Sequence, residues 1–160
     1  MVFLKGCPLQ CPWCANPESQ NFKPEISSLF NRCIGCGVCE KVCTENAIIA
    51  GERGYEIDKK LCNNCGICAE ECYAESKQMI GREVTVDEIV EEIEKDAVFY
   101  RKSGGGVTLS GGEPLAQPEF ILEVLGRCKN MNIDTTIETC GYCNNDAVKD
   151  IAKYLDLIYF

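Results

Sequence analysis

The sequence predicts an α/β protein built as about half of a parallel βα barrel and interrupted by a cysteine-rich insert. Two observations lead to this fold class. Strand and helix patterns alternate after Gly81, and the pattern C-x2-C-x2-C-x3-C occurs twice before them. Alternating strands and helices favour a parallel sheet, but a full barrel needs about 250 residues. We therefore expect a partial barrel from residues 1–24 and 81–160, with an insert at residues 25–80.

The expected elements of the barrel part follow in chain order. Thr85 and Glu88 form a T-x-x-E capping box before a helix that runs to about Tyr100. Further helices are expected at 118–129 and 144–154, and short apolar strands at 2–4, 107–109, 135–139 and 157–160. The last strand pattern stops without a cap or a polar tail, so we interpret the chain as truncated after about four strands.

Composition excludes several classes of protein. The chain of 160 residues has a net charge of −9 and no run of Lys or Arg, so nucleic-acid binding through a basic patch is not expected. No apolar stretch approaches the roughly 20 residues that span a bilayer. The first residues lack the layout of a signal peptide. We expect a cytoplasmic protein with no membrane partner.

The chain contains 14 cysteines and no histidine. In a short secreted chain, that many cysteines would indicate disulfides, but a reducing cytosol favours metal binding. The absence of histidine removes the usual general base and the usual nitrogen ligand of zinc. Thiolate chemistry is what remains.

Eight cysteines form the repeat, in which each cysteine of the second copy lies 29 residues after its counterpart in the first. In two-cluster ferredoxins, the fourth cysteine of such a run ligates the other cluster. We therefore expect two [4Fe–4S] cubes. One takes Cys33, Cys36, Cys39 and Cys72, and the other takes Cys62, Cys65, Cys68 and Cys43. A pair of zinc sites is the alternative. Thr44 and Tyr73 replace the proline that follows the fourth cysteine in bacterial ferredoxins.

The first cysteine group, Cys7, Cys11 and Cys14, has a different spacing, C-x3-C-x2-C. It offers three thiolates to a cube of four irons and leaves one iron open, as a catalytic zinc keeps an open position for substrate. The alternative is a third ferredoxin-type cube whose fourth ligand lies elsewhere. A Gly111-Gly112-Glu113-Pro114 turn follows a predicted strand, where barrel enzymes place their sites. The glycines permit close approach to a ligand, and Glu113 can accept hydrogen bonds from an ammonium group.

These two motifs resemble the radical S-adenosylmethionine (SAM) superfamily. The resemblance implies that the open iron chelates the amino and carboxylate groups of S-adenosylmethionine. It also implies that Trp13 flanks the adenine, and that Gly111, Gly112 and Glu113 hold the methionine amino group. The fold would then be a partial barrel of the radical SAM type with a ferredoxin-like insert.

A closer resemblance is to the glycyl-radical-enzyme activating proteins, relatives of pyruvate formate-lyase activating enzyme. It rests on the first cysteine motif, the two ferredoxin repeats and the segments 16–19, 110–114 and 137–141. It implies an oxidoreductase that cleaves S-adenosylmethionine reductively and installs a glycyl radical on a partner enzyme. Three cubes, a low-potential donor such as flavodoxin or ferredoxin, and an acidic Glu138 near the sulfonium are implied as well. In that family, further ligand-lining residues come from later strands.

Two other functions stay open from the sequence: a ferredoxin-type electron carrier, and a radical SAM enzyme that acts on another substrate. Cys128 lies on the apolar face of a predicted helix and is expected in the core. Cys140 and Cys143 form a lone C-x2-C pair whose role the sequence leaves open.

Overall fold

The computed structural model describes residues 1–143 and 145–160. Its contacts divide the chain into two compact units. Unit 1 consists of Met1–Lys23 and Glu83–Phe160, and unit 2 consists of Pro24–Arg82. Among the described residues, no helix combines the length and apolar character that a membrane crossing requires.

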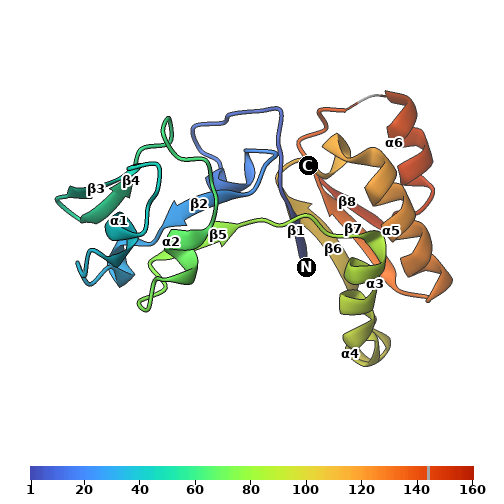
Figure 1. The fold of residues 1–160 in the computed structure, drawn as a ribbon. Coiled ribbons are helices and arrows are strands. Elements are labelled where there is room, and N and C mark those ends of the chain that lie inside the picture. The colour runs from blue at the N-terminus through green and yellow to red at the C-terminus, as the bar shows by residue number, and fades with distance from the viewer. Residues whose placement is uncertain (144) are drawn as a thin grey trace. The chain divides into compact units, whose positions relative to one another are not determined.

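Unit 1 is built on a four-stranded sheet in the order β1-β6-β7-β8 (Figure 1). The strands are β1 (Val2–Leu4), β6 (Gly106–Gly111), β7 (Asp134–Glu138) and β8 (Leu157–Tyr159). Every neighbouring pair is parallel, with Val2 opposite Leu109 and Thr136 opposite Leu157. The α/β class and the parallel sheet are confirmed. Because all strands run the same way, their C-terminal ends lie at one edge of the sheet, which is where ligand sites of α/β sheets occur.

Four helices accompany this sheet: α3 (Val86–Lys95), α4 (Ala97–Ser103), α5 (Pro118–Asn130) and α6 (Asn145–Ala152). The predicted capping box is present, because the Glu88 N–H donates to Thr85 Oγ1 and the Thr85 N–H donates back to Glu88 Oε2. The single helix expected up to about Tyr100 is wrong. It breaks at Asp96, whose ψ of 1° closes α3, and aspartate is a poor helix-interior residue. The expected start of the last helix, residue 144, lies outside the described residues.

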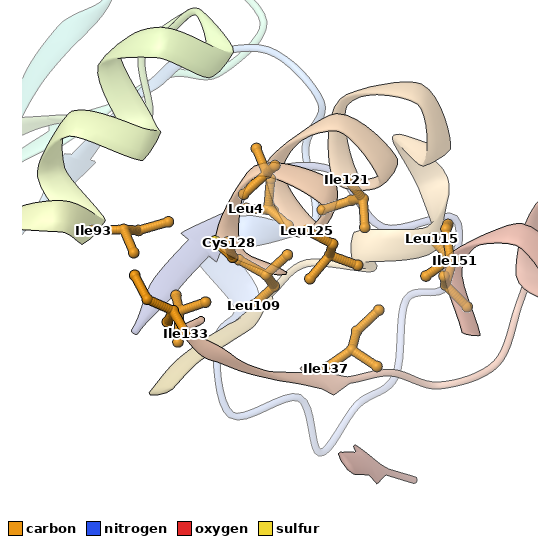
Figure 2. Close-up of a cluster of buried hydrophobic side chains, with 12 residues drawn as sticks. Leu4, Ile93, Leu109, Leu115, Ile121, Leu125, Cys128, Ile133, Ile137 and Ile151 are labelled. Atoms are coloured by element: carbon orange, nitrogen blue, oxygen red, sulfur yellow. The ribbon is translucent and has the colours of Figure 1, made fainter. Parts of the chain in front are cut away.

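The core of unit 1 collects apolar side chains from strands and helices that are distant in sequence. Figure 2 shows ten of them labelled, among them Leu109 and Ile137 from the sheet and Ile121 and Leu125 from α5. Cys128 is fully buried in this cluster, as expected for a cysteine that acts as a small apolar residue. Burial of this cluster fixes α5 on the sheet and so fixes the ends of β6 and β7.

Unit 2 contains two antiparallel strand pairs, β2 (Glu25–Ser28) with β5 (Lys77–Ile80) and β3 (Ile48–Gly51) with β4 (Gly54–Ile57). Its two helices are single turns, α1 (Val38–Lys41) and α2 (Ile67–Glu70). A short 3-10 turn lies at Phe30–Arg32 in this unit, and two more, Pro17–Ser19 and Pro114–Ala116, lie in unit 1. The buried apolar cluster of this unit is small and consists of Ile26, Cys39, Ile48 and Cys68. Small units with so little core usually need an additional crosslink such as bound metal.

Candidate functional site

Two loops meet at the C-terminal edge of the parallel sheet. The loop after β1 carries the first three cysteines, and the turn that starts at Gly111, the last residue of β6, carries Gly112 and Glu113. Backbone hydrogen bonds join them. The Gly112 N–H donates to the Leu4 carbonyl at 2.7 Å, and the Glu113 N–H donates to the Gly6 carbonyl at 2.8 Å. The beginning of the cysteine loop is therefore held directly against the glycine turn.

The glycines of this turn are required by backbone crowding. Gly111 has φ of 100°, and a Cβ atom there would lie 2.4 Å from the Leu4 carbonyl oxygen. A Cβ atom on Gly112 would lie 2.3 Å from the Gly6 oxygen and 2.9 Å from that of Ser19. The sequence analysis expected the glycines to let backbone approach a ligand. The structure shows that they let the turn approach the first strand and its loop.

The three cysteines of the first loop are all partly exposed. The Cys7 N–H donates to the Gln20 carbonyl at 3.0 Å, and the Cys14 N–H donates to the Cys11 carbonyl at 3.1 Å. Trp13, which stands between Cys11 and Cys14 in sequence, is 83% exposed. The loop thus presents three thiols and one aromatic ring at the surface of unit 1.

The Glu113 carboxylate, which the sequence predicts to contact a ligand ammonium, is engaged by protein groups in this structure. Glu113 is only 1% exposed, and both its oxygens accept hydrogen bonds from the protein. Oε1 accepts from the Leu115 N–H at 2.9 Å and the Thr139 hydroxyl at 2.7 Å. Oε2 accepts from the N–H and the thiol of Cys140, both at 2.8 Å. The carboxylate therefore ties the glycine turn to the end of β7, and it acts as a positioning group.

Residues at the end of β7 complete this arrangement. Partial desolvation, together with the hydrogen bond to Glu113, raises the pKa of Cys140 to about 11, so this cysteine stays a thiol that can donate. Glu138, the last residue of β7, accepts a hydrogen bond from the Ser110 hydroxyl at 2.5 Å. Sequence reasoning assigned no role to Ser110, Thr139 or Cys140. All three lie in the segments 110–114 and 137–141 that carry the family resemblance, and Cys140 also belongs to the Cys140–Cys143 pair.

In unit 2, the eight repeat cysteines line two hollows. One hollow holds about 310 Å³ of empty space, and the other holds about 280 Å³. The cysteines that line the first, which we name the Cys33 site, are Cys33, Cys36, Cys39 and Cys72. The cysteines that line the second, which we name the Cys62 site, are Cys43, Cys62, Cys65 and Cys68. The structure thus brings together the two sets that the sequence analysis grouped, each with three cysteines from one copy of the repeat and one from the other.

The two copies of the repeat have matching backbones. Gly37 and Gly66 occupy equivalent positions and have φ of 73° and 90°, while Asn46 and Glu75 both have φ of 51°. The sulfur atoms also match. Cys43 Sγ accepts from the N–H four residues later at 3.3 Å, and Cys72 Sγ does the same at 3.2 Å. Where equivalent side chains differ, the two sites therefore differ in side-chain chemistry and not in backbone geometry.

The largest such difference is at the first residue of the strand that follows each copy, Lys77 in one and Ile48 in the other. Both side chains are buried, Lys77 with 2% and Ile48 with 4% exposure, and each lines its hollow. The Lys77 ammonium donates to the Ser28 hydroxyl at 2.7 Å and to the Tyr55 carbonyl. It also lies 5.9 Å from the centre of the Phe30 ring. Within the described part of the chain, these contacts include no carboxylate.

The charge of Lys77 acts to lower the pKa of thiols in the Cys33 site. Burial raises the pKa of Cys68, in the Cys62 site, to about 11. Burial also raises the pKa of the equivalent Cys39, but there Lys77 opposes the rise. The pKa of Cys33 is lowered, chiefly by backbone hydrogen bonds from Tyr55 and Gly35, with Lys77 adding to the effect. The Cys33 site therefore favours negative sulfur more than the Cys62 site does.

The donors fit an iron–sulfur cube at each hollow. Four thiols surround empty space in each, and four cysteines are the usual ligands of [4Fe–4S] clusters. A buried ammonium needs a compensating negative charge, which a thiolate-bound cluster would supply at the Cys33 site. Among the described residues, no three Cys, Asp or Glu side chains converge closely enough to bind a single metal ion. The eight repeat cysteines lie around the two hollows, an arrangement that suits ligands at the corners of a cube.

Comparison with known proteins agrees with the site at the edge of the parallel sheet and with the two cysteine-lined hollows. The model of the Radical SAM superfamily matches residues 62–160, and that of the 4Fe-4S dicluster domain matches residues 32–76. These two matches imply iron–sulfur clusters and S-adenosylmethionine as the cofactors.

Several curated relatives are similar over the whole chain. An isethionate sulfite-lyase activating enzyme of Oleidesulfovibrio alaskensis is 44% identical and is matched by 100% of this chain and 53% of its own length. A trans-4-hydroxy-L-proline dehydratase activating enzyme of Clostridioides difficile is 42% identical, over 99% of this chain and 53% of its own. A choline trimethylamine-lyase activating enzyme of O. alaskensis is 41% identical, over 100% and 53%. The chain spans about half the length of these relatives. With its parallel sheet, its cysteine loop held against the glycine turn and its family match, this chain belongs to the radical SAM superfamily.

Proposed function

We propose that this chain is the S-adenosylmethionine-cleaving part of an activating enzyme that installs a glycyl radical on a partner enzyme. The observation that carries the proposal is the three-cysteine loop held by backbone hydrogen bonds against the glycine turn, at the C-terminal edge of a parallel sheet. The similarity to activating enzymes over the whole chain supports the same function.

We further propose three [4Fe–4S] clusters: one at the first three cysteines, one at the Cys33 site and one at the Cys62 site. Residues 1–24 and 81–160 would form part of a radical SAM barrel, and residues 25–80 a ferredoxin-like insert. The division of contacts into two units at nearby boundaries supports this organisation. So does the pairing of hollows, in which each copy of the repeat lends its fourth cysteine to the other.

The residues of unit 1 have distinct tasks in this proposal. Cys7, Cys11 and Cys14 would hold three irons of the first cluster and leave the fourth for the methionine end of S-adenosylmethionine. When bound, that cluster supplies the electron that cleaves S-adenosylmethionine to methionine and a 5′-deoxyadenosyl radical, which takes a hydrogen atom from a glycine of the partner. Trp13 would cover the adenine and exclude water.

The glycine turn and the end of β7 would form the other wall of the ligand site. The backbone at Gly111 and Gly112 would face the methionine ammonium. Glu113 would hold that backbone in place through its bonds to Thr139 and Cys140. Glu138, oriented by the Ser110 hydroxyl, would place a carboxylate near the positive sulfonium. The attraction between these two charges would position the sulfonium before the electron arrives.

The partner is proposed to be a glycyl radical enzyme, and the electron donor a low-potential protein such as flavodoxin or ferredoxin. The relatives activate lyases and a dehydratase, as their names state. Their identities to this chain, between 41% and 44%, differ too little to select one partner. A neighbouring gene for a glycyl radical enzyme would identify it.

Anaerobic reconstitution of the full-length protein that carries this chain tests the proposal. With iron, sulfide, S-adenosylmethionine and dithionite, we expect 5′-deoxyadenosine, measured by chromatography, and about 12 irons for three cubes of four irons. Cys11→Ala should abolish the product and lower the iron content by about a third. Cys128→Ala removes a cysteine from the core of unit 1 and should leave the iron content unchanged. Full iron with no product would refute the activity and leave an electron carrier.

A further inference from the structure

The two cysteine hollows of unit 2 have the same backbone and different charges. The charged residue that lines the Cys33 site is Lys77, and the one that lines the Cys62 site is Glu45. Counting along the repeat, Lys77 corresponds to Ile48, and Glu45 corresponds to Ala74. The structure therefore places a buried cation at one site and a surface anion at the other.

Lys77 has the stronger effect, because it is buried. Its ammonium is held by the Ser28 hydroxyl and the Tyr55 carbonyl, so the charge stays at the wall of the hollow. Charge interactions in a protein interior are screened far less than those at the surface. Glu45 is exposed, and its carboxylate accepts a hydrogen bond from Asn63 at 3.2 Å. As an anion beside the Cys62 site, Glu45 disfavours reduction there. It therefore adds to the difference in potential between the two sites, but less than Lys77 does.

A nearby positive charge favours the more negative oxidation state of an iron–sulfur cluster. Reduction of a [4Fe–4S]2+ cube to the 1+ state adds one electron and moves no proton, so the cube and its thiolates become more negative by one charge. Net charge near the cluster and hydrogen bonds to its sulfurs are the main determinants of its potential. The matched N–H donors to Cys43 and Cys72 cancel in the comparison. The hydrogen bond from Gly35 to Cys33 has its counterpart in the Asn64 N–H, which donates to Cys62 Sγ at 3.4 Å. The differences that remain are the charge at the wall and the backbone hydrogen bond from Tyr55 to Cys33, which also favours negative sulfur at the Cys33 site.

We infer that Lys77 makes the cluster at the Cys33 site the more easily reduced of the two, so that a single electron entering unit 2 comes to rest there. The inference rests on the two cubes of the proposed function. The electron comes from a one-electron donor of low potential, such as the flavodoxin or ferredoxin proposed above. The Cys62 site, which has Ile48 at the position of Lys77, would be reduced second.

Redox titration followed by electron paramagnetic resonance tests this order. The full chain is reconstituted anaerobically in a background in which Cys7, Cys11 and Cys14 are alanine, so that only the two clusters of unit 2 contribute. Cys36→Ser and Cys65→Ser each change one ligand and identify which signal belongs to which site. In the protein with Lys77 intact, the signal that appears first on partial reduction should be the one altered by Cys36→Ser.

Two variants then remove the charge. Lys77→Met keeps the length of the side chain, and Lys77→Gln keeps hydrogen-bond donors toward Ser28 and Tyr55. In both, we expect the equilibrium constant for reduction of the Cys33 site to fall at least tenfold, which is 59 mV for a one-electron couple. The potential of the Cys62 site should shift much less. Ile48→Met, a change of apolar residue at the equivalent position, is the matched control and should shift neither potential as far.

The outcomes separate the inference from the assignment of the clusters. If iron analysis and resonance show no cubes at these cysteines, the proposed clusters are wrong. If both cubes are present but the Cys62 site is reduced first, the inference is wrong. It is also wrong if both Lys77 variants retain full iron and change the equilibrium constant for reduction of the Cys33 site less than twofold. The order of reduction with Lys77 intact decides the question even if both variants fail to fold.

Discussion

Replacing Glu113 by glutamine tests the role that the structure gives to this buried carboxylate. The change keeps size and shape but converts one acceptor oxygen into an NH2 donor. Four donors point at the carboxylate: two N–H groups, from Leu115 and Cys140, one hydroxyl from Thr139 and one thiol from Cys140. The hydroxyl and the thiol can rotate, but the N–H groups cannot. In either orientation of the amide, one backbone N–H therefore faces another donor.

The expected cost follows from this count. A hydrogen bond to a charged group is worth about 1.5–3 kcal/mol, and a buried donor without a partner costs about 1–3 kcal/mol. These contributions overlap, so we expect Glu113→Gln to destabilise unit 1 by about 2–4 kcal/mol. For a chain of this size, 1 kcal/mol corresponds to about 2–4 °C, and the thermal midpoint should fall by about 5–15 °C. Glu94→Gln, on the exposed side of α3, should change it little.

The measurement is thermal unfolding followed by circular dichroism, under anaerobic conditions, at one scan rate and without S-adenosylmethionine. The absence of ligand matters, because a carboxylate that only contacts the ligand ammonium would not affect the unliganded protein. An unchanged midpoint for Glu113→Gln, together with a lower affinity for S-adenosylmethionine by calorimetry, would refute the positioning role. That result would instead support the direct contact between Glu113 and the ligand ammonium that the sequence predicts.

Three further predictions follow from the packing of each unit. Gly112→Ala should disrupt the bond between the glycine turn and Gly6 and lower the iron content at the first cluster, because the new methyl group meets backbone. In Gly105→Ala, the new methyl group meets only the Ser103 hydroxyl, at 3.1 Å, and the iron content of the first cluster should stay unchanged. A hydrogen bond from Lys129 keeps the pKa of Asp156 below its usual 3.8. The contribution of ionised Asp156 to the free energy of unfolding is therefore complete above pH 3.8. It is lost as the pH falls through the lower pKa that Asp156 has in the folded protein. The Asp156→Asn variant should have a lower thermal midpoint than the unchanged protein at neutral pH, and the difference between the two midpoints should shrink in acid. Finally, iron chelation should raise amide hydrogen exchange in unit 2 more than in the core of unit 1, because unit 2 has little apolar core.

The sequence predicted the elements of unit 1 well wherever local signals decide them. Helix α5 lies within one residue of its expected bounds, because its apolar periodicity is regular over more than three turns. The break between α3 and α4 was missed. Ile93 and Ala97 continue one apolar stripe across Asp96, so periodicity alone gives no sign of the break.

The site was predicted in part, and the reason lies in how far apart its partners are in sequence. The grouping of the eight repeat cysteines follows from spacing that is local to each copy. The burial of Glu113 does not, since three of its four donors lie 26 or 27 residues later in the chain. Lys77 was missed for another reason: a lysine at the start of a strand is usually solvated. Extending the alignment of the two copies past their last cysteines would have set it against Ile48.

The exchange of cysteines between the two copies bears on how unit 2 arose. Each hollow takes three cysteines from one copy and its fourth from the other, so neither hollow is completed by one copy in this arrangement. A peptide carrying one copy would complete sites of this kind only as a pair of identical chains. Gene duplication and fusion turn that encounter of two molecules into an intramolecular one. Once fused, the two positions that a symmetric pair must share, now Ile48 and Lys77, are free to differ.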